Sequence, residues 1–152
     1  MKQPELYARF RALHEQKGRI LLTGRTDNFI QGRPDLEDII RRLVAFAKVG
    51  ADVLYAPYPA DMHAVSAIVK AVAPKPVNIV VGTMSGTVPW AELQKAGVKR
   101  VSMGVALYTR VMGDLRKAAK QLADGDLASA SEGIGFGEVM QMISEATKPN
   151  AA

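Results

Sequence analysis

Apolar residues recur along the chain in two alternating patterns, short continuous runs and longer stretches with helical spacing. The runs begin near Ile20, Val53, Val77 and Val101, and each covers only a few residues, as buried strands do. Between the runs, apolar residues return every three or four positions, which is typical of amphipathic helices. Continuous apolar strands covered by helices predict an α/β fold with four parallel βα units.

The predicted helices begin and end at residues that favour those positions. Asp35 and Asp61 each precede a helical stretch, where a carboxylate accepts hydrogen bonds from the free backbone N–H groups of the first turn. Gly50 follows the first of these stretches, as glycine commonly does at a helix end. The helical spacing covers residues 4–16, 36–47, 61–72, 90–97, 107–122 and 136–146.

The length of the chain limits the architecture. A closed barrel of eight βα units typically needs about 250 residues, whereas this chain has 152. We therefore predict half of a (βα)8 TIM-type barrel, with four parallel βα units and flanking helices. The half barrel is expected at residues 1–125, and residues 126–152 are expected to form a glycine-rich link and a C-terminal helix.

The composition of the chain argues against several classes of function. The chain has no cysteine, which excludes disulfides, thiolate metal sites and cysteine nucleophiles. Its net charge is 20 − 15 = +5, but the basic residues are spread along the chain and aromatic residues are few, so nucleic-acid binding is not expected. The sequence has no apolar segment of signal-peptide type and none long enough for a membrane span, which predicts a cytoplasmic protein without a membrane partner.

Candidate chemistry lies where the first strand ends. Active sites of parallel βα folds gather at the carboxyl ends of strands, and here the first apolar run leads directly into Arg25 and Asp27. A guanidinium can hold a carboxylate or a phosphonate with two parallel hydrogen bonds. The residues alone leave two interpretations open, a structural Arg25–Asp27 ion pair or a substrate-binding arginine.

Other polar residues follow the later strands. Thr83 and Ser85 follow the third strand and could either hold an anion or cap the next helix. Tyr55, Tyr58 and Tyr108 lie near strand ends and could serve either in packing or as proton donors. His14 and His63 have no partner at metal-ligand spacing, so both are predicted to be surface residues.

Three segments resemble a known family. The stretches LTGRTDNF at 22–29, PKPVNIVVG at 74–82 and AELQKAGVKRVSMG at 91–104 occur in the order and spacing of the isocitrate lyase/phosphoenolpyruvate mutase family. The resemblance covers about residues 5–120 and corresponds to the C-terminal half of the family's barrel.

The resemblance implies a function. Members of the family use Mg²⁺ and make or break a C–C or P–C bond in small 2-oxo or 2-hydroxy acids. By resemblance, Arg25 holds the carboxylate or phosphonate of the substrate, with Asp27, Thr83 and Ser85 as further site residues. The family's metal-binding carboxylates belong to the preceding half of the barrel, so this chain is expected to supply no ligand for Mg²⁺. Asn78 is expected to lie away from the site.

Two functional hypotheses follow from this resemblance. The chain is either part of a lyase or mutase of this family, completed by four further βα units, or a catalytically silent half barrel that self-associates or binds a small carboxylate. Because a half barrel has open strand edges, either a homo-oligomer or a partner completing the barrel is expected. The last helix, which often crosses to a neighbouring subunit in the family, is expected to be able to do so here.

Overall fold

The computed structural model describes residue 12 and residues 20–82 and 88–147. Internal contacts divide the chain into two units, a sheet unit that extends to Leu107 and a helical unit that begins at Tyr108. The helix predicted at residues 4–16 lies outside the described residues except for residue 12, which is helical.

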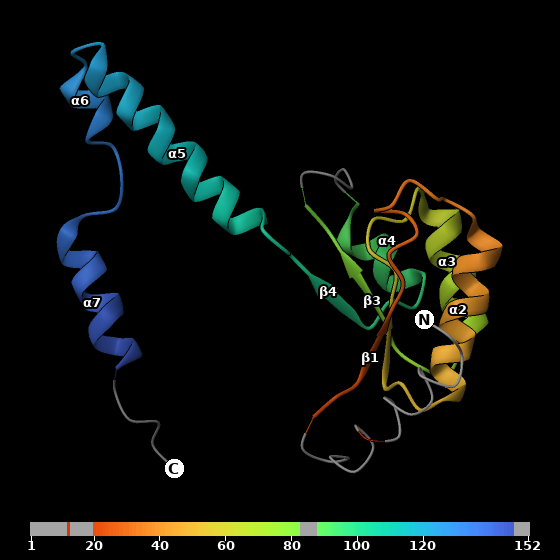
Figure 1. The fold of residues 1–152 in the computed structure, drawn as a ribbon. Coiled ribbons are helices and arrows are strands. Elements are labelled where there is room, and N and C mark those ends of the chain that lie inside the picture. Colours follow the sequence, from red (N-terminus) through yellow and green to blue (C-terminus); the bar gives the residue numbers. More distant parts are fainter. Residues whose placement is uncertain (1–11, 13–19, 83–87, 148–152) are drawn as a thin grey trace. The chain divides into compact units, whose positions relative to one another are not determined.

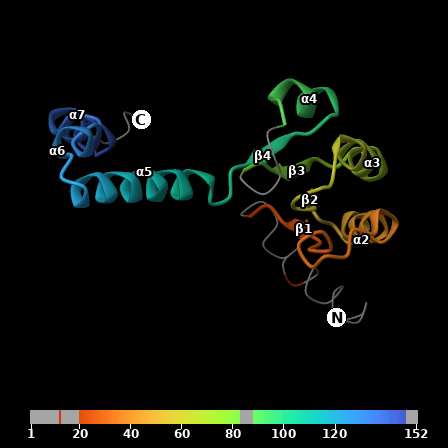
Figure 2. The ribbon, with the colours of Figure 1, turned by 90° about the horizontal axis from the view of Figure 1, so that it is seen from above.

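The sheet unit consists of four parallel strands and the helices that connect them (Figure 1). The strands lie in the order of the sequence, and in Figure 2 they form a curved row with the helices on its outer side. This confirms the predicted α/β fold with four parallel strands. The strands are β1 (Thr23–Arg25), β2 (Val53–Tyr55), β3 (Val77–Val80) and β4 (Arg100–Ser102), and the helices are α2 (Leu36–Lys48), α3 (Met62–Val72) and α4 (Trp90–Lys95).

The two longer helices of the sheet unit begin at the predicted caps. The Asp35 carboxylate accepts a hydrogen bond from the backbone N–H of Asp38 at 3.0 Å, and that of Asp61 accepts one from Ala64 at 2.8 Å. Each cap satisfies one of the free N–H groups of the first helical turn. These capping hydrogen bonds therefore fix where the two helices start. They also fix the lengths of the loops that follow β1 and β2.

The core of the sheet unit lies between the strands and the helices. Its largest fully buried apolar side chains come from helices and strands alike and are Ile39, Leu43, Leu54, Ile68, Val77 and Leu93. The central strands β2 and β3 are mostly buried, whereas Arg25 in β1 and Arg100 in β4 are exposed. Among the described residues, β1 and β4 each pair with only one neighbouring strand, so each has a free edge.

The strand register separates two faces of the sheet. Gly24 pairs with Leu54, and Leu54 pairs with Val77; these residues face the helices, where a Cβ on Gly24 would lie 2.6 Å from the Cβ of Phe46. Because successive residues of a strand point to opposite faces, the next row lies on the other face. That row contains Arg25, Tyr55 and Asn78.

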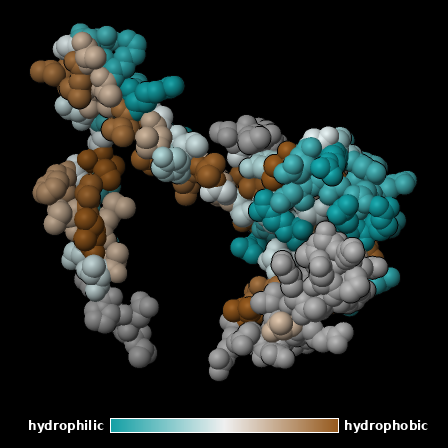
Figure 3. Space-filling view, viewed as in Figure 1, coloured by the Kyte–Doolittle hydropathy of each residue, from teal (hydrophilic) through white to brown (hydrophobic). Residues whose placement is uncertain are grey.

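The helical unit has a different character. Helix α5 (Ala106–Ala123) begins at the boundary between the units and is followed by α6 (Leu127–Ala130) and α7 (Phe136–Ala146). Helix α6 lies in the segment predicted to be a link, and its cap Asp126 accepts a hydrogen bond from the Ser129 N–H at 3.0 Å. None of the side chains in α5, α6 or α7 is buried, and Figure 3 shows apolar side chains on their surface.

Candidate functional site

Arg25 is the last residue of β1, and its side chain is held from two sides. Its Nε donates a hydrogen bond to Oδ1 of Asp27 at 2.7 Å, and its guanidinium carbon lies 5.1 Å from the centre of the Tyr55 ring. Within the described part of the chain, the terminal nitrogens Nη1 and Nη2 have no hydrogen-bond partner. Arg25 therefore has an oriented guanidinium with a free pair of donors, while half of its side chain is exposed.

The electrostatic environment keeps Arg25 charged. The hydrogen bond that Arg25 donates to Asp27 is the main cause of a raised pKa of Arg25, and the negative charge of Asp27 adds to it, although partial burial acts in the opposite direction. A permanently charged, partly desolvated guanidinium is suited to bind a carboxylate or a phosphonate.

A cavity of about 330 Å³ lies beside Arg25, between the β1–α2 loop and helix α2. Three arginines and two aspartates contribute to its lining. Arg25 pairs with Asp27 and Arg42 pairs with Asp38, whereas Arg33 forms no ion pair with any described residue. The cavity therefore carries an excess positive charge. Its lining residues are Arg25, Thr26, Asp27, Asn28, Gln31, Arg33, Asp38, Arg42 and Phe46.

A chain of hydrogen bonds fixes the loop that carries Arg25 and Asp27. The buried Thr26 hydroxyl donates to Oδ1 of Asn28 at 2.6 Å, and Nδ2 of Asn28 donates to Oδ2 of Asp38 at 2.8 Å. Nε of Arg42 donates to the same Asp38 oxygen at 2.6 Å, and Arg41 pairs with the other oxygen. The loop is thus attached to the first turns of α2.

Asp38 is the acceptor at the centre of this chain. The hydrogen bond from Arg42, followed by the one from Asn28, holds the pKa of Asp38 below its ordinary value. The ionised carboxylate is therefore the form that the folded loop stabilises.

The structure brings together two of the four predicted site residues. Arg25 and Asp27 form the ion pair described above. Because this bond occupies only Nε, Arg25 can form a structural ion pair and can also bind a substrate anion, so both interpretations stay chemically possible. Thr83 and Ser85 lie outside the described residues.

Sequence patterns did not reveal how the other strands contribute to this face. Tyr55 is in register with Arg25, and Asn78 is in register with Tyr55, so Asn78 lies in the same row rather than on the opposite face. Asn78 is 3% exposed; its Nδ2 donates to the Ser102 hydroxyl at 3.1 Å, and its Oδ1 has no hydrogen-bond partner among the described residues. Only the strand pairing could have shown this row.

An Mg²⁺ ion would need several oxygen ligands gathered at one place. The described residues contain no group of three or more histidine, aspartate or glutamate side chains that could hold a metal ion. Both aspartates next to Arg25 already accept hydrogen bonds from arginines. The side chains described do not fit an Mg²⁺ site, so no chemical step is assigned to a metal held by them.

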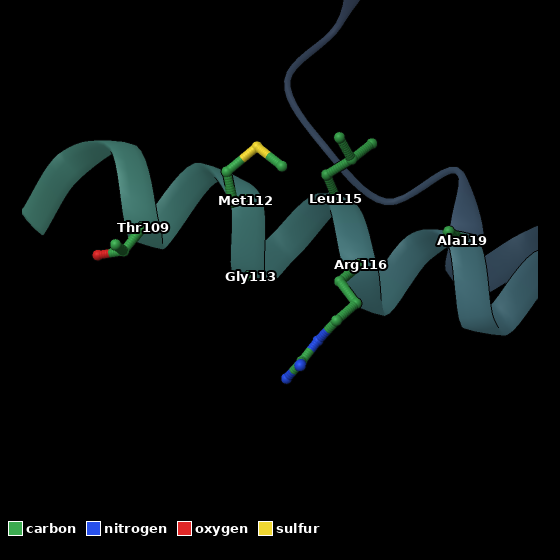
Figure 4. A pocket seen from close by; sticks show the side chains of 6 residues that line it. All are labelled: Thr109, Met112, Gly113, Leu115, Arg116 and Ala119. Atoms are coloured by element: carbon green, nitrogen blue, oxygen red, sulfur yellow. The ribbon is translucent and has the colours of Figure 1, made fainter. Parts of the chain in front are cut away.

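A second hollow, of about 550 Å³, lies along helix α5 (Figure 4). Met112 and Leu115 point to one side of the helix, and Arg116 points to the other. The lining comes from this one helix and is mostly apolar. Within the described residues, no helix is long and apolar enough to cross a membrane.

Comparison with known proteins identifies the family. A family model for phosphoenolpyruvate phosphomutase matches residues 2–123. A solved structure from Burkholderia cenocepacia J2315, described as a proposed lyase/mutase, is 34% identical, with a TM-score of 0.85 over 95% of this chain and 53% of that chain. A search of curated proteins finds no match.

More distant structures have the same fold. A phosphoenolpyruvate phosphomutase from Streptomyces platensis subsp. rosaceus is 24% identical, with a TM-score of 0.73 over 95% of this chain and 53% of that one. An oxaloacetate acetylhydrolase, solved with the inhibitor 3,3-difluorooxalacetate, is 24% identical, with a TM-score of 0.78 over 96% of this chain and 51% of that one.

The chain thus spans about half the length of the solved structures that it matches. The four parallel strands correspond to half of a TIM-type barrel, as predicted. The resemblance noted in the sequence is confirmed: this chain belongs to the phosphoenolpyruvate phosphomutase family.

Proposed function

We propose that this chain provides the substrate-anion site of a lyase or mutase that acts on small 2-oxo or 2-hydroxy acids. Arg25 binds the carboxylate or phosphonate of the substrate. The observation that carries the proposal is that Nη1 and Nη2 of Arg25 bind no described residue, at the carboxyl end of a parallel strand in a protein of this family.

The neighbours of Arg25 support a binding role. Asp27 occupies Nε alone, so the outer edge of the guanidinium can donate two parallel hydrogen bonds to one anion. Tyr55 lies against the guanidinium, which limits its rotation before a ligand binds. An orientation fixed in advance reduces the entropy that binding removes.

The chemical step needs groups beyond those described. Breaking a C–C or P–C bond next to a carboxylate develops negative charge that Mg²⁺ would stabilise in an enzyme of this type. We propose that four further βα units supply the ligands for this ion, while Arg25 orients the substrate by its anionic group. Thr83 and Ser85 remain candidates for contacts with the same group.

Oxalate binding tests the role of Arg25. We expect the purified chain to bind oxalate in an NMR titration, with shifts at the amides of the β1–α2 loop. Arg25→Ala should weaken binding roughly tenfold to a hundredfold, because charge-assisted hydrogen bonds are lost. Arg41→Ala is the matched control, since Arg41 pairs with Asp38 but does not line the cavity. Equal oxalate affinity in Arg25→Ala and the unaltered chain would contradict the proposal.

A second candidate function, self-association, is favoured by the helical unit. None of its helical side chains is buried, and several large apolar ones are more than half exposed, among them Leu115, Phe136 and Ile143. An exposed apolar area of this kind indicates an interaction surface. We propose that a second copy covers it, with exchange of the segment 126–152 through the glycines at 132–137.

Solution mass tests the association. We expect light scattering to give twice the 16.4 kDa of one chain. Leu115→Glu should shift the mass towards a single chain, because a charge would enter the apolar interface. Arg110→Gln, at an exposed arginine of α5 that does not line the hollow, is the control and should leave the mass unchanged. A single-chain mass for the unaltered protein would contradict self-association.

A further inference from the structure

Tyr58 has an unusual backbone conformation. Among the residues that the structure describes, it is the one residue other than glycine with a positive φ, at 58°. A bulky side chain is disfavoured there because its Cβ approaches the neighbouring carbonyl oxygen. Strain of this kind persists only where the surroundings impose it, and it concentrates at functional sites.

The β2–α3 loop is held on both sides of Tyr58. Pro57 is fully buried, which anchors the backbone immediately before Tyr58. Pro59 follows, and because a residue before proline favours an extended backbone with negative φ, the positive φ of Tyr58 departs from that preference as well. Three residues after Tyr58, Asp61 caps α3 and fixes the end of the loop. Tyr58 therefore has little freedom to adopt a negative φ while Pro57 and Asp61 keep their positions.

The same loop brings Tyr58 to the Arg25 site. Arg25 and Tyr55 are register partners, so the carboxyl ends of β1 and β2 lie side by side, and Tyr58 follows Tyr55 by three residues. Tyr58 is also among the groups within electrostatic range of Arg25, after Asp27 and Tyr55. Tyr58 is half-buried, and its hydroxyl makes no hydrogen bond to any described residue.

We propose that Tyr58 is a second anion-binding residue of the Arg25 site, whose hydroxyl donates a hydrogen bond to the carboxylate or phosphonate that Arg25 holds. This inference rests on the proposed function of Arg25 and extends it. Arg25 supplies the charge, and Tyr58 adds a directional donor that favours an oxyanion over a halide.

Two substitutions of Tyr58 separate the hydroxyl from the strain. Tyr58→Phe removes only the hydroxyl, and we expect it to weaken oxalate binding roughly tenfold in an NMR titration. Tyr58→Gly removes the ring and accepts the positive φ without strain. We expect this variant to bind oxalate more weakly and to unfold at a higher urea concentration. Tyr108→Phe, at an exposed tyrosine of α5, is the control and should change neither property.

The possible results distinguish this inference from the proposal on which it rests. Weaker binding in Tyr58→Phe, together with a higher urea midpoint in Tyr58→Gly, would support a strained anion-binding residue. If Arg25→Ala abolishes oxalate binding and Tyr58→Phe leaves it unchanged, the role of Tyr58 is overturned while that of Arg25 stands. If the unaltered chain does not bind oxalate, or if Arg25→Ala binds it equally well, both are overturned.

Discussion

The two units of the chain differ in what holds them together. In the sheet unit, α2 and α3 bury apolar faces against β1 to β3, and several side chains are completely shielded from solvent. In the helical unit, α5 to α7 have well-formed helices with apolar residues at helical spacing, yet none of these residues is buried. Helical periodicity is therefore present in both units, but among the described residues only the sheet unit has a core.

This difference indicates a division of roles. The groups suited to bind an anion lie in the unit with its own core, where Thr26, Asn28 and Asp38 fix the loop next to Arg25. Precise placement of a guanidinium needs such rigid support. An amphipathic helix without a buried face is instead suited to cover, or be covered by, another surface.

The largest expected difference between the units concerns leucine truncation. Leu43 is fully buried, so Leu43→Ala should lower the free energy of unfolding by about 2–5 kcal/mol. Leu115 in α5 is 60% exposed, so at low protein concentration Leu115→Ala should change the free energy of unfolding by less than about 0.5 kcal/mol. Urea unfolding followed by circular dichroism measures both values. Similar losses in the two variants would mean that α5 has a core of its own.

Adding a methyl group to glycine should have opposite effects in the two units. In Gly24→Ala, the new Cβ would lie 2.6 Å from Phe46, which should reduce stability by about 1–3 kcal/mol. In Gly113→Ala, the new Cβ would have no atom of another described residue within 4 Å, apart from its own chain neighbours and helix backbone. Since alanine favours a helix interior, that variant should gain about 0.5–1 kcal/mol of helix stability. Thermal melts of both variants measure these changes in stability. A loss of stability in Gly113→Ala would contradict the expected contrast.

The smallest expected effect concerns acid sensitivity. Because the folded pKa of Asp38 lies below its ordinary value of 3.8, Asp38 stabilises the fold above that pH. This stability is lost as the pH falls through the folded pKa. Asp38→Asn should therefore make the urea midpoint of the sheet unit less sensitive to pH below 3.8.

Asp126 provides the matched comparison in the other unit. Hydrogen bonds from the side chain and backbone of Ser129 hold the pKa of Asp126 below its ordinary value too, but α6 contributes no buried residue. Asp126→Asn should leave the acid dependence of the sheet unit unchanged. If Asp38→Asn and Asp126→Asn changed the acid dependence of the sheet unit equally, the two units would not be independent in stability, which would contradict this comparison.

Local patterns in the sequence were sufficient to predict much of the sheet unit. The caps Asp35 and Asp61 and the apolar runs gave the order of strands and helices, because each depends on neighbouring residues. The pairing of Arg25 with Asp27 was also accessible, since the two residues lie two positions apart.

Features that depend on distant residues could not be predicted in this way. The row of Arg25, Tyr55 and Asn78 depends on strand register, and the cavity depends on the approach of α2 to β1. The left-handed conformation of Tyr58 had no local signal, because the usual sign is a glycine. Amphipathic spacing in α5 predicted a helix correctly, but spacing does not show what covers its apolar side.

Hydrogen exchange over a dilution series tests the comparison of the two units most directly. The sheet unit should keep its core amides, such as Leu54 and Ile79, protected at every protein concentration, because its core lies within one chain. Amides of α5 to α7 should be protected at high concentration and should lose that protection on dilution, since their apolar faces need a second copy. Protection of α5 to α7 that persists in the diluted, single-chain protein would contradict the account.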